Sequence, residues 1–288
     1  MACNRRPISR STLIATSSGS STERPTACTS CRRPALRRSE SSHGVEGRFA
    51  TCADSRDEWN EGPLPKPDDF MGPTLWTSDL SIFAKVGQAF PKPSGAPEGS
   101  HLDMLHESPH CVGIAHERDN VYWVFDGLNG NVVRYDFQKD HGPGGASHAD
   151  GIVRRYPETK VKRIEGVVGH VIIDGTSLYV ADTGGGRVLR VDLTTGSVNG
   201  KLPPEELLAE YTKVEGVKVE VLASGLREPS GIAVHDGRVY VGEHATGDIV
   251  VIGGERIATG AKGLAGLAFQ NQKLFFVDEV GKRVVRVD

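Results

Sequence analysis

The feature that most constrains this fold is the segment Leu178–Asp192, LYVADTGGGRVLRVD, because it recurs along the chain. Its first apolar run ends at Asp182, three glycines follow, and a second apolar run ends at Asp192. Glycine reaches positive φ without a Cβ clash, which a tight chain reversal requires. The segment therefore predicts a β-hairpin, and its nearly continuous apolar runs predict strands that are covered on both faces.

Three further segments repeat this hairpin: Tyr122–Asp136, Val239–Ile252 and Leu274–Asp288. In three of the four copies, ten residues separate the first acid from the second. A glycine with a short apolar strand precedes the first acid of each copy by 12 or 13 residues: Gly113, Gly169, Gly231 and Gly266. This spacing predicts a repeat protein built from β-sheet units.

A single small sheet cannot bury both of its faces, whereas sheets arranged around an axis cover one another. The repeats therefore predict an all-β fold, a β-propeller. A degenerate copy of the hairpin, Leu75–Asp79, lies 47 residues before Asp126 and extends the count to five blades. The expected domains are a tail over residues 1–60, a proline-rich linker over 61–74 and the propeller over 75–288.

The motifs resemble the NHL-repeat family of six-bladed propellers. Pro229–Val234 matches its P-x-G-I-A-V element, and Leu178–Asp192 matches its hairpin. The resemblance implies a ring of six blades that is incomplete or degenerate in this chain. More distantly, the chain is similar to the peptidyl-hydroxyglycine amidating lyases and to the gluconolactonase and paraoxonase-like propellers.

The first 42 residues differ in composition from the rest of the chain. They hold eight arginines, ten serines and two acids. Such a segment buries too little apolar surface to fold, so we expect a disordered N-terminus. It is typical of an organellar transit peptide; a mis-assigned translation start or an inert tail is equally open, and the protein would then be soluble without an organellar address.

Charge and hydropathy limit the partners that this chain can bind. The net charge is −3 and residues 1–42 contribute +6, which leaves −9 for the rest. An acidic body argues against nucleic-acid binding. No apolar window is long enough for a membrane span. We expect a monomer that binds a small molecule or a protein ligand.

Propeller topology predicts a polar top face near the axis. The hairpin acids and one neighbour should gather there: Glu107, Asp126, Asp182, Glu243 and Asp278. Because an acid recurs in every blade, capping of the turn is its simplest role. Four histidines are the candidate metal ligands on this face: His110, His170, His106 and His244. The resemblance to amidating lyases implies zinc and that to the lactonases implies calcium, and copper also suits imidazole ligands.

A glycine-rich loop after Asp136 holds a second polar group, expected on the opposite face: Asp140, His141, His148 and Asp150. These side chains could surround an ion or belong to a solvated turn. Among the five cysteines, Cys28 and Cys31 form an isolated CxxC, and Cys111 is expected to be a small buried hydrophobic residue.

Two functions follow from these patterns. The first is a propeller that binds a ligand, a partner or a metal ion at its axial top face. The second is a metal-dependent lyase or hydrolase, in which a cation with an open position activates water or polarises a carbonyl. Whether the protein is an enzyme stays open. Nucleophilic catalysis has little support, because the chain lacks a G-x-S-x-G motif.

Overall fold

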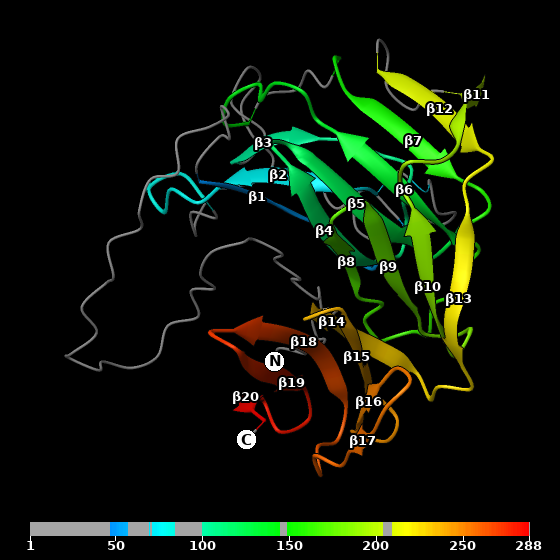
Figure 1. Cartoon of the computed structure of the whole chain (residues 1–288). Helices are drawn as coiled ribbons and strands as arrows, with labels where there is room; N and C mark the ends of the chain where they lie inside the picture. Colours follow the sequence, from blue (N-terminus) through cyan, green and yellow to red (C-terminus); the bar gives the residue numbers. More distant parts are fainter. Residues whose placement is uncertain are drawn as a thin grey trace, which may run out of the picture.

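A computed structural model describes residues 47–56, 69, 71–83, 100–144, 149–203 and 209–287. These residues form twenty β-strands in five sheets. Figure 1 shows the sheets following one another around an arc, which is the arrangement of blades in a β-propeller. The five blades expected from the repeats are therefore confirmed, whereas the NHL type and a sixth blade stay predictions.

The first two sheets contain the first seven strands, and the second sheet also contains two strands from further along the chain. The first sheet comprises β1 (Arg48–Thr51), β2 (Thr74–Thr77) and β3 (His101–Met104). The second sheet comprises β4 (Cys111–Arg118), β5 (Val121–Asp126), β6 (Asn131–Asp136), β7 (Ile152–Tyr156), β12 (Glu210–Glu215) and β11 (Ser197–Lys201). Strand β12 joins its edge by pairing parallel to β7.

The remaining three sheets follow the repeat pattern more closely. The third sheet comprises β8 (Val171–Asp174), β9 (Ser177–Asp182), β10 (Arg187–Asp192) and β13 (Val219–Ser224). The fourth comprises β14 (Pro229–His235), β15 (Arg238–Glu243), β16 (Ile249–Val251) and β17 (Arg256–Ile257). The fifth comprises β18 (Leu264–Gln270), β19 (Lys273–Asp278) and β20 (Arg283–Arg286).

Each pair of neighbouring sheets encloses its own apolar core. Leu75 of the first sheet and Ile114 of the second belong to one core, and Val132 of the second and Val180 of the third belong to another. Two further cores join the third sheet to the fourth and the fourth to the fifth. All six residues of β5 are buried, because this strand is covered on both faces. Full burial of each large apolar side chain contributes about 1.5–3 kcal/mol, so these interfaces hold the blades together.

The innermost strands are joined by backbone hydrogen bonds from sheet to sheet. The N–H of Cys111 donates to the carbonyl of Ala53, at 3.1 Å, and links the second sheet to the first. The N–H of Gly169 donates to Val112 O at 2.9 Å, and the N–H of His170 donates to Ser230 O at 3.2 Å. The blades therefore meet along their inner strands, as the radial arrangement requires.

Two boundaries differ from those expected from the sequence. Strand β1 lies inside the predicted tail of residues 1–60, and pairing of Phe49 with Trp76 makes it the edge of the first sheet. The sequence of Pro203–Tyr211, with a proline first and acids in the next turn, predicts a short helix, but the chain enters β12 at Glu210. Edge pairing with β7 explains this strand. Residues 1–46 and 204–208 lie outside the described residues. In the described part of the chain, no helix has the length and hydropathy to cross a membrane.

Candidate metal centre

The hairpin acids cap the turns of their own blades. The carboxylate oxygen of Asp182 accepts a hydrogen bond from the N–H of Gly185 at 3.1 Å. Asp126 accepts from the N–H of Asn129 at 2.9 Å, and Asp278 accepts from that of Gly281 at 2.9 Å. In all three the donor lies three residues after the acid, which is the turn-capping role considered from the sequence.

The same acids are also neutralised by arginine side chains. Asp182 pairs with Arg187 and Asp278 with Arg283, at 2.7 and 3.0 Å. Asp126 pairs with Arg155 at 2.7 Å, and Glu243 pairs with Arg256. Burial opposes ionisation of Glu243, but its hydrogen bonds with Arg256 and with the N–H of Arg227 lower its pKa. The carboxylate oxygens of these acids therefore already accept hydrogen bonds from the turn and from the arginine.

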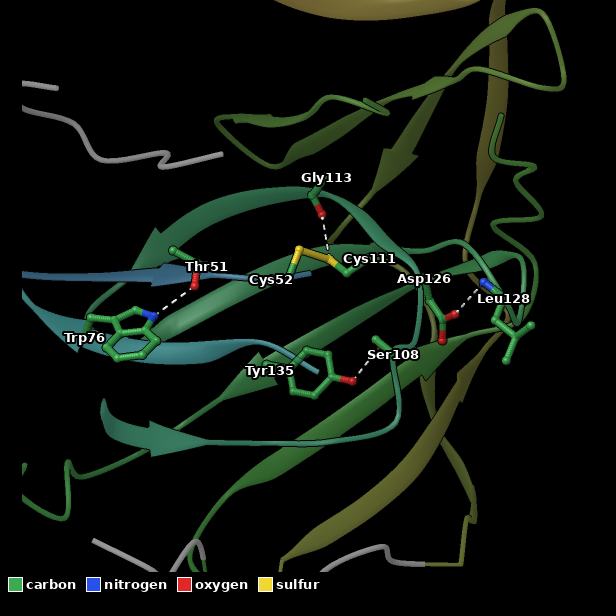
Figure 2. Close-up of a disulfide and its surroundings, with 9 residues drawn as sticks. All are labelled: Thr51, Cys52, Trp76, Ser108, Cys111, Gly113, Asp126, Leu128 and Tyr135. Atoms are coloured by element: carbon green, nitrogen blue, oxygen red, sulfur yellow. Dashed lines mark hydrogen bonds between the residues drawn. A yellow bond between two sulfur atoms is a disulfide. The ribbon is translucent and has the colours of Figure 1, made fainter. Parts of the chain in front are cut away.

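The candidate histidines of the top face have separate partners. His110 Nδ1 lies 2.6 Å from Asp54, which also pairs with Arg163 at 3.2 Å. Both Glu107 and His110 have positive φ, 77° and 54°, so this segment has a strained backbone. His106 is buried. Figure 2 shows the neighbourhood of this segment, where the Ser108 hydroxyl contacts Tyr135 at 2.6 Å.

The other two histidines lie between later blades. His170 Nδ1 accepts a hydrogen bond from the N–H of Ile232, and desolvation lowers its pKa to about 4. His244 contacts Glu228 at 3.0 Å and Glu279 at 3.7 Å. Among the described residues, none of the histidines and acids expected on the top face belongs to a group of three with metal-binding spacing.

One such group does exist, and it lies elsewhere. Asp103, His141 and Asp150 each place one ligand atom so that all three atoms lie within 4.8 Å of one another. His141 Nε2 is 3.0 Å from an oxygen of Asp150, and its Nδ1 is 3.7 Å from Asp103 Oδ2. The Asp103 side chain is fully buried, His141 is half-buried and Asp150 is partly exposed. This cluster is the candidate metal centre.

The centre is assembled from two sheets. Asp103 is in β3 of the first sheet, whereas the β6–β7 loop of the second sheet carries His141 and Asp150. This loop lies along β3, because the N–H of His141 donates to Leu102 O at 3.0 Å and that of Gly144 to His101 O at 2.7 Å. The Asp103 Oδ1 atom accepts from the N–H of Met104 at 2.7 Å, which orients the carboxylate.

The structure brings together only some of the residues of the second polar group expected from the sequence. It brings His141 and Asp150 together, but Asp140 forms an ion pair with Arg48 instead. His148 lies outside the described residues. The sequence analysis missed Asp103, although an acid between Leu102 and Met104 is a visible signal. A carboxylate in an apolar strand is costly to bury without a partner.

The donor set of one imidazole nitrogen and two carboxylate oxygens suits a divalent cation. Imidazole favours zinc and other transition metals, whereas carboxylates also accept manganese, magnesium and calcium. Three protein ligands would leave at least one coordination position for water or a ligand. The centre has the composition of an open metal site.

A disulfide links the two sheets that form this centre. Cys52, which follows β1, bonds to Cys111, the first residue of β4, across a sequence separation of 59 residues (Figure 2). The expectation that Cys111 is only a small hydrophobic residue was therefore wrong. Its partner lies within the predicted tail, where the sequence shows no repeat that would place it beside β4.

Searches of family models and of curated sequences find no match to this chain. Among solved structures, a nidogen/laminin complex is 10% identical, with a TM-score of 0.48, and the match covers 85% of this chain and 73% of that one. An auxiliary nutrient binding protein from Bacteroides thetaiotaomicron is 10% identical, with a TM-score of 0.48 and coverages of 83% and 56%. This chain thus spans little more than half of that protein.

A virginiamycin B lyase from Staphylococcus aureus, crystallised with quinupristin, is 13% identical to this chain. Its TM-score is 0.41, and the match covers 85% of this chain and 78% of the lyase. Likenesses this distant carry no functional argument.

Proposed function

We propose that this propeller binds one divalent cation at Asp103, His141 and Asp150, and that the bound cation forms part of a ligand-binding site. The observation that carries the proposal is the convergence of a fully buried carboxylate, an imidazole and a second carboxylate within 4.8 Å. The ligands come from two sheets, so the cation would also hold the first blade to the second.

The location differs from the axial top face expected from the sequence. There, each of the four hairpin acids already accepts hydrogen bonds from its turn or an arginine, as Asp182 does from Gly185 and Arg187. Recruiting such an acid to a cation would break these bonds and leave its arginine without the counter-charge.

Metal titration of the full chain tests the proposal. Zinc and manganese should each bind with a stoichiometry of one when followed by calorimetry, and Asp103→Asn and His141→Ala should abolish this event. His116→Ala is the matched control, because His116 lies in β4 and its Nε2 contacts Asp119 O at 3.0 Å. Cys28→Ser/Cys31→Ser removes binding by the CxxC thiols. Unchanged binding in both centre variants would refute the proposal.

A metal-dependent lyase or hydrolase is the second candidate. The specific observation is the partial exposure of Asp150, which gives solvent access to a centre with open coordination positions. A cation there would lower the pKa of bound water and polarise a carbonyl oxygen. Turnover of lactones and esters should require added metal, disappear in Asp103→Asn and persist in His116→Ala. Turnover in the absence of metal would exclude this candidate.

A further inference from the structure

The second sheet carries two strands more than a blade of this fold requires. Strands β4 to β7 form its blade, and the other described sheets hold three or four strands each. Strand β12 extends the blade by pairing parallel to β7, and β11 forms the outer edge beyond it (Figure 1). The two extra strands therefore bring their side chains next to those of β6 and β7.

One row of side chains that crosses this extended sheet is rich in cations. Arg134 of β6 stands opposite Arg154 of β7. Arg154 stands opposite Thr212 of β12, and Thr212 stands opposite Lys201 of β11. The residues that alternate with this row pack in the core shared with the first sheet: Tyr135, Val153, Tyr211 and Leu202. Because side chains alternate along a strand, the whole row lies on the other face, toward the third sheet.

Only the first cation of this row is neutralised by an acid. Arg134 donates to both carboxylate oxygens of Glu117, at 2.8 and 3.0 Å. Arg154 forms no ion pair with any acid that the structure describes, not even with Glu210, which lies two residues before Thr212 on the same face. Lys201 is exposed and likewise forms no ion pair within the described part of the chain. Two positive charges in the row are therefore left without a counter-charge.

Two buried polar atoms of the same row have no hydrogen-bond partner. The Thr212 side chain is 4% exposed, and its Oγ1 forms no hydrogen bond. The Nε atom of Arg154 is also buried and also forms none. These two residues are cross-strand neighbours, so both atoms belong to one place on the sheet. Buried donors without an acceptor are destabilising and rare in native proteins, which indicates that a ligand supplies the acceptor.

We infer that Arg154, Thr212 and Lys201 form a binding site for a phosphate group. The Nε and one Nη of a guanidinium donate in parallel to two oxygens of an oxyanion. The Thr212 hydroxyl can donate to a third oxygen, which a phosphate has and a carboxylate lacks. Lys201 adds a second positive charge at the exposed edge strand, from which the anion would enter. This site shares no residue with the Asp103 centre and does not rest on cation binding there.

Calorimetric titration of the metal-free full chain with inorganic phosphate tests the inference. One phosphate should bind per chain. Arg154→Met should raise the dissociation constant at least tenfold, because it removes both the charge and the paired donors. Thr212→Val should raise it at least threefold; this variant keeps the shape of the side chain and loses only the hydroxyl, so it remains informative if Arg154→Met does not fold. Circular dichroism checks the fold of each variant.

Lys213→Met is the matched control. It removes one positive charge directly beside Thr212, but Lys213 alternates with Thr212 along β12 and so lies on the opposite face. This variant should bind phosphate like the wild-type protein, and so should Asp103→Asn, which disables only the candidate metal centre. Phenyl phosphate identifies the source of the group: if it binds as inorganic phosphate does, the site accepts phosphorylated ligands, and if it does not bind, the site is specific for the free ion.

Four results would overturn the inference. The wild-type chain may bind no phosphate, or it may bind acetate as tightly as phosphate. Binding that persists unchanged in both Arg154→Met and Thr212→Val would place the anion elsewhere, for example on the arginines of residues 1–42. An equal loss of affinity in Lys213→Met and Arg154→Met would show a general effect of charge rather than a site.

Discussion

The Nδ1 atom of His170 accepts a hydrogen bond from the backbone N–H of Ile232, at 3.0 Å, across the boundary between the third and fourth sheets. Only an unprotonated Nδ1 can accept, so this contact requires the tautomer that carries its proton on Nε2. The inner strand of one blade is thus joined to the next by a side chain, in addition to the backbone bond between His170 and Ser230.

This contact predicts a loss of stability in acid. The pKa of His170 is about 4 in the folded protein, below its ordinary value of 6.5. Between these values the unfolded chain binds the extra proton, so the free energy of unfolding falls as the pH drops through this window. The loss attributable to His170 should reach at most about 3 kcal/mol. Urea unfolding near pH 7 and near pH 4.5 measures it.

The variant His170→Asn distinguishes the contribution of this histidine to the loss of stability in acid from the contribution of carboxylates, which also titrate in acid. Its side-chain oxygen can accept from Ile232 but cannot be protonated in this range. The variant should lose less stability than the wild-type protein over the same pH interval, whereas His116→Asn should follow the wild-type protein. Parallel pH profiles for wild-type and His170→Asn would contradict the assignment.

The two acids of one repeat should differ sharply in their contribution to stability. Asp182 is buried and binds the N–H of Lys162, the N–H of Gly185 and the guanidinium of Arg187. Asp182→Ala leaves these donors without an acceptor and should lower the free energy of unfolding by about 3 kcal/mol. Asp192→Ala should cost far less, because Asp192 binds Thr194 at the surface. If chemical denaturation shows that Asp182→Ala and Asp192→Ala lower the free energy of unfolding equally, a capping role specific to the first acid is contradicted.

The glycines of the inner strands provide a third test. Gly113→Ala places a methyl group 1.7 Å from the carbonyl oxygen of Gly169, so the second and third blades must separate. We expect the free energy of unfolding to fall by about 3 kcal/mol, as it does in an overpacked core. Gly266→Ala should leave the free energy of unfolding nearly unchanged, because no atom lies within 4 Å of the place that its Cβ would occupy. Similar losses in the two variants would refute the difference in packing.

The parts of the fold that repeat could be predicted, because repetition makes a local signal visible. The first acid, the glycine turn and the buried strand ending at Asp182 reappear in each later blade, so their shared role follows from their spacing. The first sheet is different. Its strands β1 and β3 have four residues each and lie far apart in the sequence, so neither shows a periodic pattern.

The candidate metal centre and the disulfide depend on this first sheet, which explains why the sequence predicted only part of the centre and did not predict the disulfide. His141 and Asp150 share one loop, and the sequence places them together. Asp103 reaches them only because the loop pairs with β3 through Leu102. Cys52 meets Cys111 for a similar reason, since β1 packs beside β4. Contacts between residues so far apart in the sequence come from tertiary packing, and the local spacing of residues does not predict them.

The disulfide should make a large contribution to stability. Cys52 and Cys111 close a loop of 59 residues, which in the chain-entropy model corresponds to about 4 kcal/mol. Reduction should therefore lower the melting temperature of the wild-type protein. The double variant Cys52→Ala/Cys111→Ala should melt at a similarly low temperature and show no further response to a reductant. If the melting temperature of the wild-type protein is the same with and without the reductant, the disulfide does not stabilise the fold.

Cation binding should stabilise the folded protein, because the centre joins two sheets that separate on unfolding. A cation at a hundred times its dissociation constant adds about 2.7 kcal/mol to the free energy of unfolding if the unfolded chain does not bind it. Zinc or manganese should raise the melting temperature, and a chelator should reverse the change. Asp103→Asn should abolish the response, since it removes the buried anionic ligand from β3, while His116→Ala should retain it. A metal-dependent shift of equal size in Asp103→Asn would place the cation elsewhere in the molecule.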